Sequence, residues 1–199
     1  MVSQTVERRA AVAALLAERG EGEARALVVS GLGSPTWDLH AAGDVPENFY
    51  LWGAMGGAAM VALGVAQAQP ARRVIALTGD GEQLMALGAL ATIGAAKPSN
   101  LTVVVLDNEH YAETGAQPSH TGRGVDMAEV ARACGFAETA VARSLSEVET
   151  LGARLAEPAN GPRLFVVKIG VEAPPRSLPT RDAPYLKTRF REALGFKPG

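Results

Sequence analysis

Short apolar runs alternate with longer amphipathic segments along most of this chain. The runs at residues 74–77 and 101–106 are almost wholly Val, Leu, Ile, Ala and Thr, a pattern typical of strands buried on both faces of a parallel sheet. Strands are expected at residues 25–30, 49–51, 74–77, 101–106, 138–141 and 164–169. Helices are expected at residues 5–19, 36–42, 54–67, 82–96, 127–134 and 146–156. Ser144 and Glu147 are spaced as a capping box for the last helix. This order predicts an α/β fold, with a mostly parallel central sheet and helices on both faces.

Two segments depart from this alternation. Residues 108–124 are polar and rich in Gly, Thr, His and Glu, and connections of that length are commonly functional. From residue 172 onward, prolines interrupt the chain before a short helical segment, so this tail cannot build a core of its own. We therefore expect one domain at residues 1–171 and a Pro-rich interface segment at residues 172–199, which lies over the domain or a partner.

Composition narrows the functional class. The chain has 199 residues, of which 47% are hydrophobic and 20% charged, and its formal net charge is −2, so it fits one ordinary globular domain. The lack of a long basic block argues against nucleic-acid binding. Glu7, Arg8 and Arg9 do not fit a signal peptide, and the longest apolar segment, residues 52–66, is shorter than the roughly 20 residues that span a bilayer. We expect a soluble, cytoplasmic protein without membrane contact.

Cys134 is the only cysteine. A single cysteine excludes an internal disulfide framework and a cysteine-ligated iron–sulfur cluster. The residue falls in the expected helix at 127–134, where we expect it to be a small buried hydrophobe.

Two oxygen ligands follow two neighbouring strands. Asp80 follows the strand at residues 74–77 within a Gly-Asp-Gly sequence, and Asn108 follows the strand at residues 101–106. Open α/β folds bind ligands at the carboxyl ends of their parallel strands. Mg²⁺ takes one or two side-chain oxygens and completes its shell with water and phosphate oxygens. The pair therefore predicts half of a metal–diphosphate clamp, although Asp80 alone could also cap a helix and Gly-Asp-Gly alone is an ordinary turn.

The same residues resemble those of a known family. The Gly-Asp-Gly sequence at residues 79–81, with Asn108 placed 28 residues after Asp80, is similar to the signature of thiamine-diphosphate enzymes. Residues 48–56, which include Gly-Ala-Met-Gly, resemble a stretch of sulfopyruvate and phosphonopyruvate decarboxylases. The likeness continues through residues 109–115 and covers most of the chain. It implies a thiamine-diphosphate-binding fold, of which this chain would be the pyrophosphate-binding part.

The resemblance also implies how the diphosphate end of the cofactor is held. Mg²⁺ would be bound by Asp80, Asn108 and the main-chain carbonyl of His110. Backbone amides and small residues around the metal would contact the diphosphate, and the residues so implicated are Ser30, Gly31, Ser34, Gly79, Gly81 and Glu82. A structural turn explains the first three equally well, and Glu82 departs from the small residue common after Gly-Asp-Gly.

Met55 resembles the apolar residue that supports thiamine in its bent conformation. By the same likeness, the Gly53 carbonyl would accept a hydrogen bond from the 4′-amino group, and Tyr111 would contact the cofactor. The bent conformation matters because the 4′-imine can remove the thiazolium C2 proton only when the two groups are within hydrogen-bond range. A core methionine is the alternative reading of Met55.

Candidate catalytic residues lie in the polar loop. His110, Glu113 and His120 could meet an anionic substrate or transfer protons. The sequence alone does not rank them.

Thiamine enzymes also need a glutamate that protonates the pyrimidine N1′ atom, supplied by a separate pyrimidine-binding domain. A chain of 199 residues leaves no space for that second domain. The resemblance therefore implies a β-type subunit, completed by an α-type subunit that supplies the glutamate, with self-association also expected. The expected activity is decarboxylation of a small anionic 2-oxo acid, a carbon–carbon lyase reaction that needs thiamine diphosphate, Mg²⁺ and the partner subunit.

Three alternatives stay open at this point. The chain could belong to an acyloin-forming carboligase, or be the β subunit of a 2-oxoacid oxidoreductase, although one cysteine is too few for the usual cluster. A third alternative is a non-catalytic scaffold subunit that keeps the fold and has lost turnover.

Overall fold

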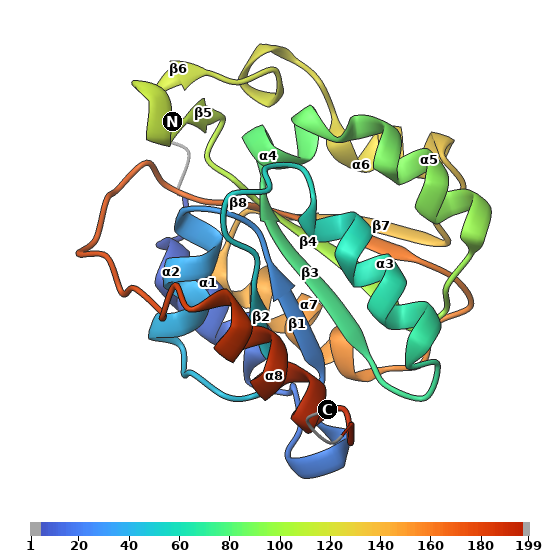
Figure 1. Cartoon of the computed structure of the whole chain (residues 1–199). Helices are drawn as coiled ribbons and strands as arrows, with labels where there is room; N and C mark the ends of the chain where they lie inside the picture. Colours follow the sequence, from blue (N-terminus) through green and yellow to red (C-terminus); the bar gives the residue numbers. More distant parts are fainter. Residues whose placement is uncertain (1–4, 197–199) are drawn as a thin grey trace.

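Six parallel strands form the centre of the structure, a computed structural model that describes residues 5–196. The strands lie in the order β2-β1-β3-β4-β8-β7, and every neighbouring pair is parallel (Figure 1). Their bounds are β1 (Leu27–Ser30), β2 (Asn48–Tyr50), β3 (Val74–Gly79), β4 (Leu101–Asp107), β7 (Glu138–Ala142) and β8 (Arg163–Lys168). The expected parallel α/β sheet is confirmed, and each expected strand is present to within a few residues.

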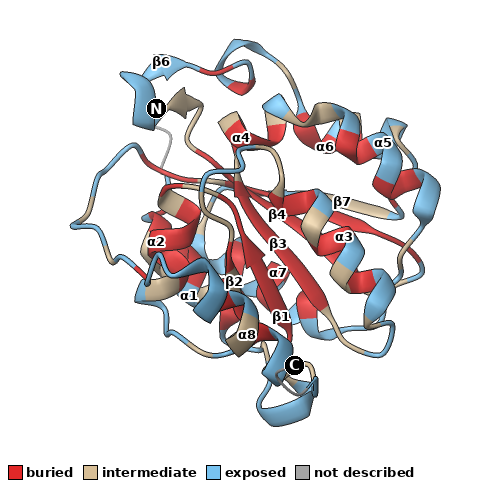
Figure 2. Cartoon of the chain, viewed as in Figure 1, coloured by how far each residue is buried: buried red, intermediate tan, exposed pale blue. Residues whose placement is uncertain are grey.

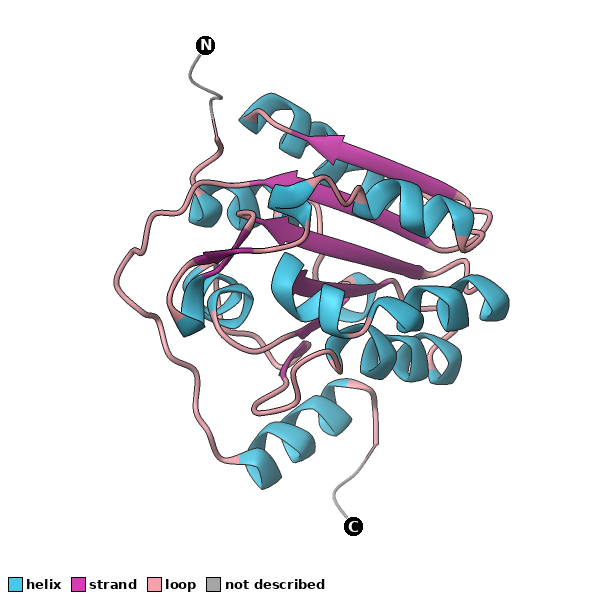
Figure 3. Ribbon diagram, turned by 90° about the horizontal axis from the view of Figure 1, so that it is seen from above, coloured by secondary structure: helices cyan, strands magenta, loops and turns pink. Residues whose placement is uncertain are grey.

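Helices cover both faces of this sheet (Figure 3). One apolar cluster joins the sheet to α1 (Arg8–Leu16), α2 (Ser34–Ala41) and α7 (Leu145–Ala156). The other joins it to α3 (Ala58–Ala68), α5 (Leu87–Ala96) and α6 (Met127–Ala133). Side chains of β4 alternate between the clusters, because successive residues of a strand point to opposite faces. Burial is therefore continuous along the central strands, as Figure 2 shows.

The strand register brings the expected ligands to one edge. Gly79, the last residue of β3, pairs with Leu106 near the end of β4. Asp80 and Asn108 follow these strands directly, so both lie at the carboxyl edge of the sheet. Beyond β4, residues 108–124 contain a small antiparallel pair, β5 (His110–Tyr111) and β6 (Gln117–Pro118), and two short 3₁₀ turns. The long polar loop is thus a folded flap over the edge.

Three expected helices differ in extent from the observed ones. The first begins at Arg8 rather than residue 5, because Val6 is extended and bridges Ile169 next to β8. The expected helix at 54–67 begins at Ala58, since Gly53 and Gly56 adopt φ values of +74° and +85° that no regular helix allows. The expected helix at 82–96 is divided into α4 (Asp80–Met85) and α5, with non-helical backbone at the intervening residue.

Two local expectations can be compared directly. The capping box of Ser144 and Glu147 is confirmed at the start of α7. Cys134 is half-buried rather than fully buried, and it packs against the second cluster from the end of α6. No helix within residues 5–196 has the length and apolar character needed to cross a membrane.

The Pro-rich tail lies over the domain. Trp52 donates from Nε1 to the Thr180 carbonyl at 3.0 Å, and the tail then enters α8 (Ala183–Ala193) beside β2 (Figures 1 and 3). The Phe190 ring of α8 lies 5.3 Å from the Phe49 ring, centroid to centroid. Arg189 forms an ion pair with Asp44 at 2.8 Å. The tail therefore covers the β2 edge of the sheet.

Candidate functional site

A cavity of about 100 Å³ opens at the carboxyl edge of the sheet. Its walls come from the ends of β3 and β4, the loop after β1, the turn before α3 and the flap at 108–124, with Arg8 at the start of α1 and Ile169 after β8. The sequence predicted ten of its lining residues as site residues: Ser34, Met55, Gly79, Asp80, Gly81, Glu82, Asn108, His110, Tyr111 and Glu113. Predicted residues from four stretches of the chain therefore meet in one cavity.

Asp80 lies at the base of this cavity, where α4 begins. Its side chain is buried. Its Oδ2 atom accepts a hydrogen bond from Ser119 Oγ at 2.5 Å and lies 3.3 Å from Thr121 Oγ1, whose single proton has a closer acceptor in Asp107. Burial raises the pKa of the Asp80 carboxyl and the charge of Asp107 adds to the rise, although hydrogen bonds from Ser119 and nearby amides oppose it. A buried carboxylate beside two hydroxyls is well suited to a bound cation, which would compensate its charge.

Asn108 and His110 form a tight turn next to Asp80. Asn108 Oδ1 accepts from the His110 N–H at 3.0 Å, and His110 Nδ1 lies 2.8 Å from the Asn108 carbonyl oxygen. Because that carbonyl can only accept, Nδ1 carries a proton, and the tautomer with a proton on Nδ1 alone has its lone pair on Nε2. The amide oxygen of Asn108 has a second lone pair, so it can still accept a metal ion.

A polar chain connects Asp80 with β8. Thr121 Oγ1 donates to Asp107 Oδ1 at 2.8 Å, and Lys168 Nζ forms ion pairs with Asp107 and Glu109, both at 2.7 Å. Glu109 is one of the non-glycine residues with positive φ, at +64°. Sequence reasoning missed Asp107, Thr121 and Lys168, because no local pattern places Lys168 beside residues some 60 positions earlier.

Glu82 is a buried carboxylate on the cavity wall. Its Oε1 accepts from the Gly56 N–H at 3.2 Å, whereas Oε2 is buried with no hydrogen-bond partner among the described residues. Burial raises the pKa of Glu82. A Cβ built on Gly31 would lie 1.6 Å from Oε2, so the carboxylate occupies space that only glycine at position 31 leaves free.

The turn before α3 presents Met55 to the cavity. Met55 is 45% exposed and lines the cavity, so it is not a core methionine. Gly53 belongs to the same turn, but it is exposed and does not line the cavity. The side chain of Met55 is therefore available to a ligand or a partner.

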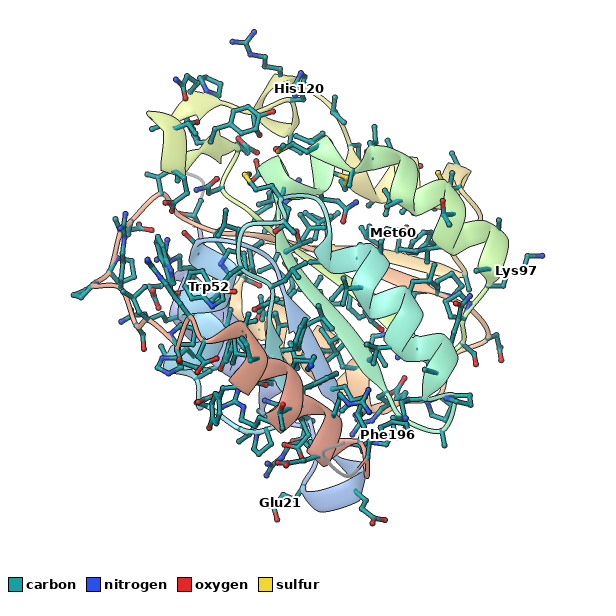
Figure 4. All side chains as sticks on the ribbon, in the orientation of Figure 1. Glu21, Trp52, Met60, Lys97, His120 and Phe196 are labelled. Atoms are coloured by element: carbon teal, nitrogen blue, oxygen red, sulfur yellow. The ribbon has the colours of Figure 1, made fainter. Side chains whose placement is uncertain are left out.

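Three residues of the flap lie at the outer rim. The Tyr111 hydroxyl lies 2.9 Å from His120 Nδ1, and a Cβ on Gly81 would lie 2.8 Å from the Tyr111 ring. His120 is exposed at the periphery (Figure 4) and does not line the cavity. Glu113 lines the cavity and lies 3.9 Å from the exposed Arg176 of the tail.

Besides Gly53 and His120, two further predicted residues lie outside the cavity. Ser30 is fully buried and its Oγ atom lies 2.6 Å from Thr36 Oγ1. The Gly31 N–H donates to the Leu77 carbonyl at 2.9 Å, and the Gly31 carbonyl accepts from Thr36 at 2.6 Å. The Ser30 hydroxyl and the Gly31 backbone therefore make their hydrogen bonds within the protein. Of Ser30, Gly31 and Ser34, only Ser34 lines the cavity.

The donor set fits Mg²⁺ bound together with a diphosphate. Within residues 5–196 no group of three or more His, Cys, Asp and Glu side chains could hold a metal by itself. Asp80 and Asn108 provide one carboxylate and one amide oxygen, which is what Mg²⁺ requires when phosphates and water complete its shell. The glycines flanking Asp80 also leave backbone open at the cavity.

Comparison with known proteins agrees with this geometry. Residues 37–169 match the family described as thiamine pyrophosphate enzyme, C-terminal TPP binding domain. Sulfopyruvate decarboxylase subunit beta from Methanocaldococcus jannaschii is 41% identical over 123 residues, which are 62% of this chain and 64% of the relative. Phosphonopyruvate decarboxylase from Streptomyces viridochromogenes is 42% identical over 163 residues, 81% of this chain and 39% of the relative.

A solved structure extends the likeness to the fold. The thiamine diphosphate-dependent 4-hydroxybenzoylformate decarboxylase from Rhodococcus jostii RHA1 superposes with a TM-score of 0.69 at 21% identity, over 86% of this chain and 34% of that one. This chain therefore spans between one third and two thirds of the proteins it matches. The resemblance expected from the Gly-Asp-Gly and Asn108 spacing is confirmed, and the chain belongs to the thiamine pyrophosphate enzymes, of which it contains the C-terminal TPP-binding domain.

Proposed function

We propose that this chain is the β-type subunit of a two-subunit, Mg²⁺-dependent thiamine-diphosphate decarboxylase acting on a small anionic 2-oxo acid. The observation that carries the proposal is the convergence of Asp80, Asn108 and Met55 on one cavity. The first two are suited to a metal–diphosphate group, and the third provides an apolar surface beside them. The names of the relatives, sulfopyruvate and phosphonopyruvate decarboxylase, support the substrate class.

The residues of the cavity have distinct roles in this proposal. Asp80, Asn108 and the His110 carbonyl hold Mg²⁺, and the backbone at Gly79 and Gly81 approaches the diphosphate. Thiamine diphosphate, once bound, supplies the electron sink for loss of CO₂. The chain itself contributes binding, orientation, exclusion of water and the proton transfer described below.

Met55 and Glu82 act on the other end of the cofactor. Met55 supports the bent form of thiamine, which keeps the reacting groups close. The hydrogen bond from Gly56 N–H to Glu82 fixes the turn that carries Met55. The Gly53 carbonyl belongs to the same turn, and it would accept the 4′-amino hydrogen bond after this turn adjusts to the ligand.

Proton transfer is assigned to the flap. His110 lines the cavity and, in the tautomer with a proton on Nδ1 alone, has a lone pair on Nε2, so it can accept a proton there. Tyr111 reaches His120 at 2.9 Å, which connects the cavity wall to solvent. Glu113 on the rim is available to orient the substrate or to relay a proton.

The partner is an α-type subunit that supplies the pyrimidine-side glutamate. Two observations support it: a relative of similar sequence is named as subunit beta, and Met55, Met60 and Met85 are all exposed apolar side chains near the turn and the helices next to it. Exposed apolar surface of this kind commonly marks interfaces.

Reconstitution tests the proposal. The chain would be purified alone and together with an α-type chain that carries the glutamate, and CO₂ release would be measured from pyruvate, sulfopyruvate and phosphonopyruvate with thiamine diphosphate and Mg²⁺. We expect turnover in the complex only, and none when it contains Asp80→Ala. Activity of the isolated chain would overturn the two-subunit assignment, and acyloin formation without net aldehyde release would replace decarboxylation by carboligation.

A further inference from the structure

One cationic residue in the cavity has no role in the proposal above. Of the described residues that line the cavity, Arg8 is the only lysine or arginine. It is 5% exposed, and it opens α1. Buried arginines are rare unless their charge is compensated. The position of Arg8 in the wall therefore calls for a ligand or a structural reason.

The structural reason accounts for only part of its bonding capacity. Arg8 Nε lies 2.9 Å from Asp38 Oδ2, and Nη1 donates to Ser34 Oγ at 2.9 Å. A guanidinium has five N–H donors in a fixed plane, and these two contacts leave donors for a further acceptor. Asp38 is fully buried on α2 and pairs with the guanidinium through charge, whereas the hydrogen bond to Ser34 positions Nη1.

The charges around Arg8 are mixed. Asp38 also faces Arg9, whose Nε lies 3.5 Å from Oδ1, and the carboxylate of Glu7 acts on Asp38 as well. The cavity wall carries the carboxylates of Asp80, Glu82 and Glu113, and Arg8 is its one cationic side chain among the described residues. Ser34 begins α2, whose dipole makes the potential there more positive, although Pro35 in the same turn contributes no N–H.

A diphosphate fits this arrangement once Asp80 has bound a cation. A diphosphate ester carries about three negative charges when fully ionised. Mg²⁺ brings two positive charges, one of which the Asp80 carboxylate already balances, so the diphosphate needs a further cation. Arginine binds phosphate oxygens with short, charge-assisted hydrogen bonds that can be bidentate. The remaining donors of Arg8 are of the type that this binding requires.

We propose that Arg8 is a diphosphate-binding residue of this cavity, held in place by Asp38 and Ser34. The proposal rests on the proposed function for the identity of the ligand. Two anions could bind Arg8, and both are tetrahedral oxyanions. In the proposal the anion is the diphosphate of the cofactor, and in the competing case it is the acid group of the substrate. The test separates these two sources.

Calorimetry on the full-length chain provides the test, with inorganic pyrophosphate plus Mg²⁺ and with thiamine diphosphate plus Mg²⁺ as probes. Arg8→Met should weaken both by about 10- to 100-fold, the effect of losing a hydrogen bond to a charged group. Arg9→Met is the matched control, because Arg9 pairs with the same Asp38 but does not line the cavity. It should change both affinities less than twofold.

A second variant separates binding from folding. Arg8→Met leaves Asp38 buried with a single partner, so Arg8→Met/Asp38→Asn removes that charge as well and should fold like the wild type by circular dichroism while still binding pyrophosphate weakly. Unchanged pyrophosphate affinity in folded Arg8→Met protein overturns the proposal. If a raised KM for the 2-oxo acid in the reconstituted complex accompanies that result, the substrate is the anion. A wild-type chain that binds neither probe overturns the proposed function together with this inference.

Discussion

Gly31 and Glu82 share one volume: a Cβ on residue 31 would lie 1.6 Å from Oε2 of Glu82. Gly31→Ala should therefore displace the carboxylate from its hydrogen bond with Gly56 and destabilise the chain by about 1–3 kcal/mol, as overpacking does. Urea unfolding measures the loss. The double variant Gly31→Ala/Glu82→Ala should recover most of it, because the new methyl group then fills the space that the carboxylate leaves. Equal stability of the two variants would contradict steric coupling.

Lys168 should support the metal site from a distance. Lys168→Met removes the cation that pairs with Asp107 and Glu109, and it leaves Asp107 buried without its partner. We expect a stability loss of about 1–3 kcal/mol, below that of a fully buried pair because Lys168 is partly exposed, and weaker Mg²⁺-dependent binding of thiamine diphosphate. Lys168→Arg, which keeps the charge, should recover part of the affinity. If Lys168→Met bound thiamine diphosphate with wild-type affinity, the ion pairs of Lys168 would have no role in the metal site.

Two asparagines provide a matched pair. Asn108→Ala removes an expected metal ligand at a strand end, so it should abolish Mg²⁺-dependent cofactor retention and leave the midpoint of thermal unfolding nearly unchanged. Asn100→Ala removes an amide whose two N–H groups are shared among three carbonyl oxygens, all within 3.0 Å of Nδ2. It should therefore cost about 2–3 kcal/mol of stability and spare the cofactor affinity of folded protein. The assignment of Asn108 would be refuted if Asn108→Ala lost stability and kept cofactor affinity. It would also be refuted if one variant lost both.

Met55→Ala should lower turnover more than cofactor affinity. The side chain is 45% exposed, so its loss should change the free energy of unfolding by less than about 0.5 kcal/mol. The diphosphate anchor stays intact, whereas the pyrimidine loses the group that holds it near the thiazolium carbon. Exchange of the C2 proton, followed by NMR in the reconstituted complex, measures this role. Exchange at the wild-type rate would exclude it.

Acid should weaken the attachment of α8 through Asp44. Burial alone would raise the pKa of Asp44, but hydrogen bonds from Arg189 and Tyr50 outweigh it and lower the pKa below the ordinary 3.8. A carboxyl with a lowered pKa in the folded state stabilises the fold above its unfolded value and loses that contribution as the pH falls through the folded value. The stability difference between wild type and Arg189→Met should thus be larger at about pH 6 than in strong acid, where the hydrogen bond from Arg189 to the Asn48 carbonyl and its contact with Tyr50 remain.

An arginine elsewhere in the tail controls for this effect. Arg181 stacks over Trp52, 5.1 Å from the ring centroid, and no carboxylate pairs with it among the described residues. The stability difference for Arg181→Met should not depend on pH in the acid range. Thermal unfolding followed by circular dichroism at each pH compares the two. An acid-insensitive difference for Arg189→Met would show that Asp44 is not the titrating group.

Local pattern was enough to locate the strand ends. The apolar runs that end at Asp80 and Asn108 made their shared edge predictable, because strands buried on both faces leave a clear signal and parallel strands end on the same side. The turn carrying Met55 was not predictable in detail, since its small, apolar composition equally favours a helix. The glycines at positions 53 and 56 set its shape through positive φ values, which composition does not reveal.

Residues that act through tertiary contacts could not be predicted from the sequence. Ser119 and Thr121 contact a carboxylate about 40 positions earlier, and Arg8 reaches Ser34 from a different helix. Each is an ordinary polar residue in its own segment. Such residues come together only through the crossover connections of the sheet. The periodicity of one sequence does not show which segments those connections place side by side.

The pairing of Asp107 with Lys168 has a consequence for folding. The two residues are in register on adjacent strands β4 and β8, yet α6, β7 and α7 all lie between them in the chain. Their contact closes only after that whole intervening stretch has compacted, and such non-local pairings form slowly. A nascent or partly unfolded chain would thus carry every ligand of the cation without the means to hold them together. Cofactor binding during refolding would then report that this contact has formed.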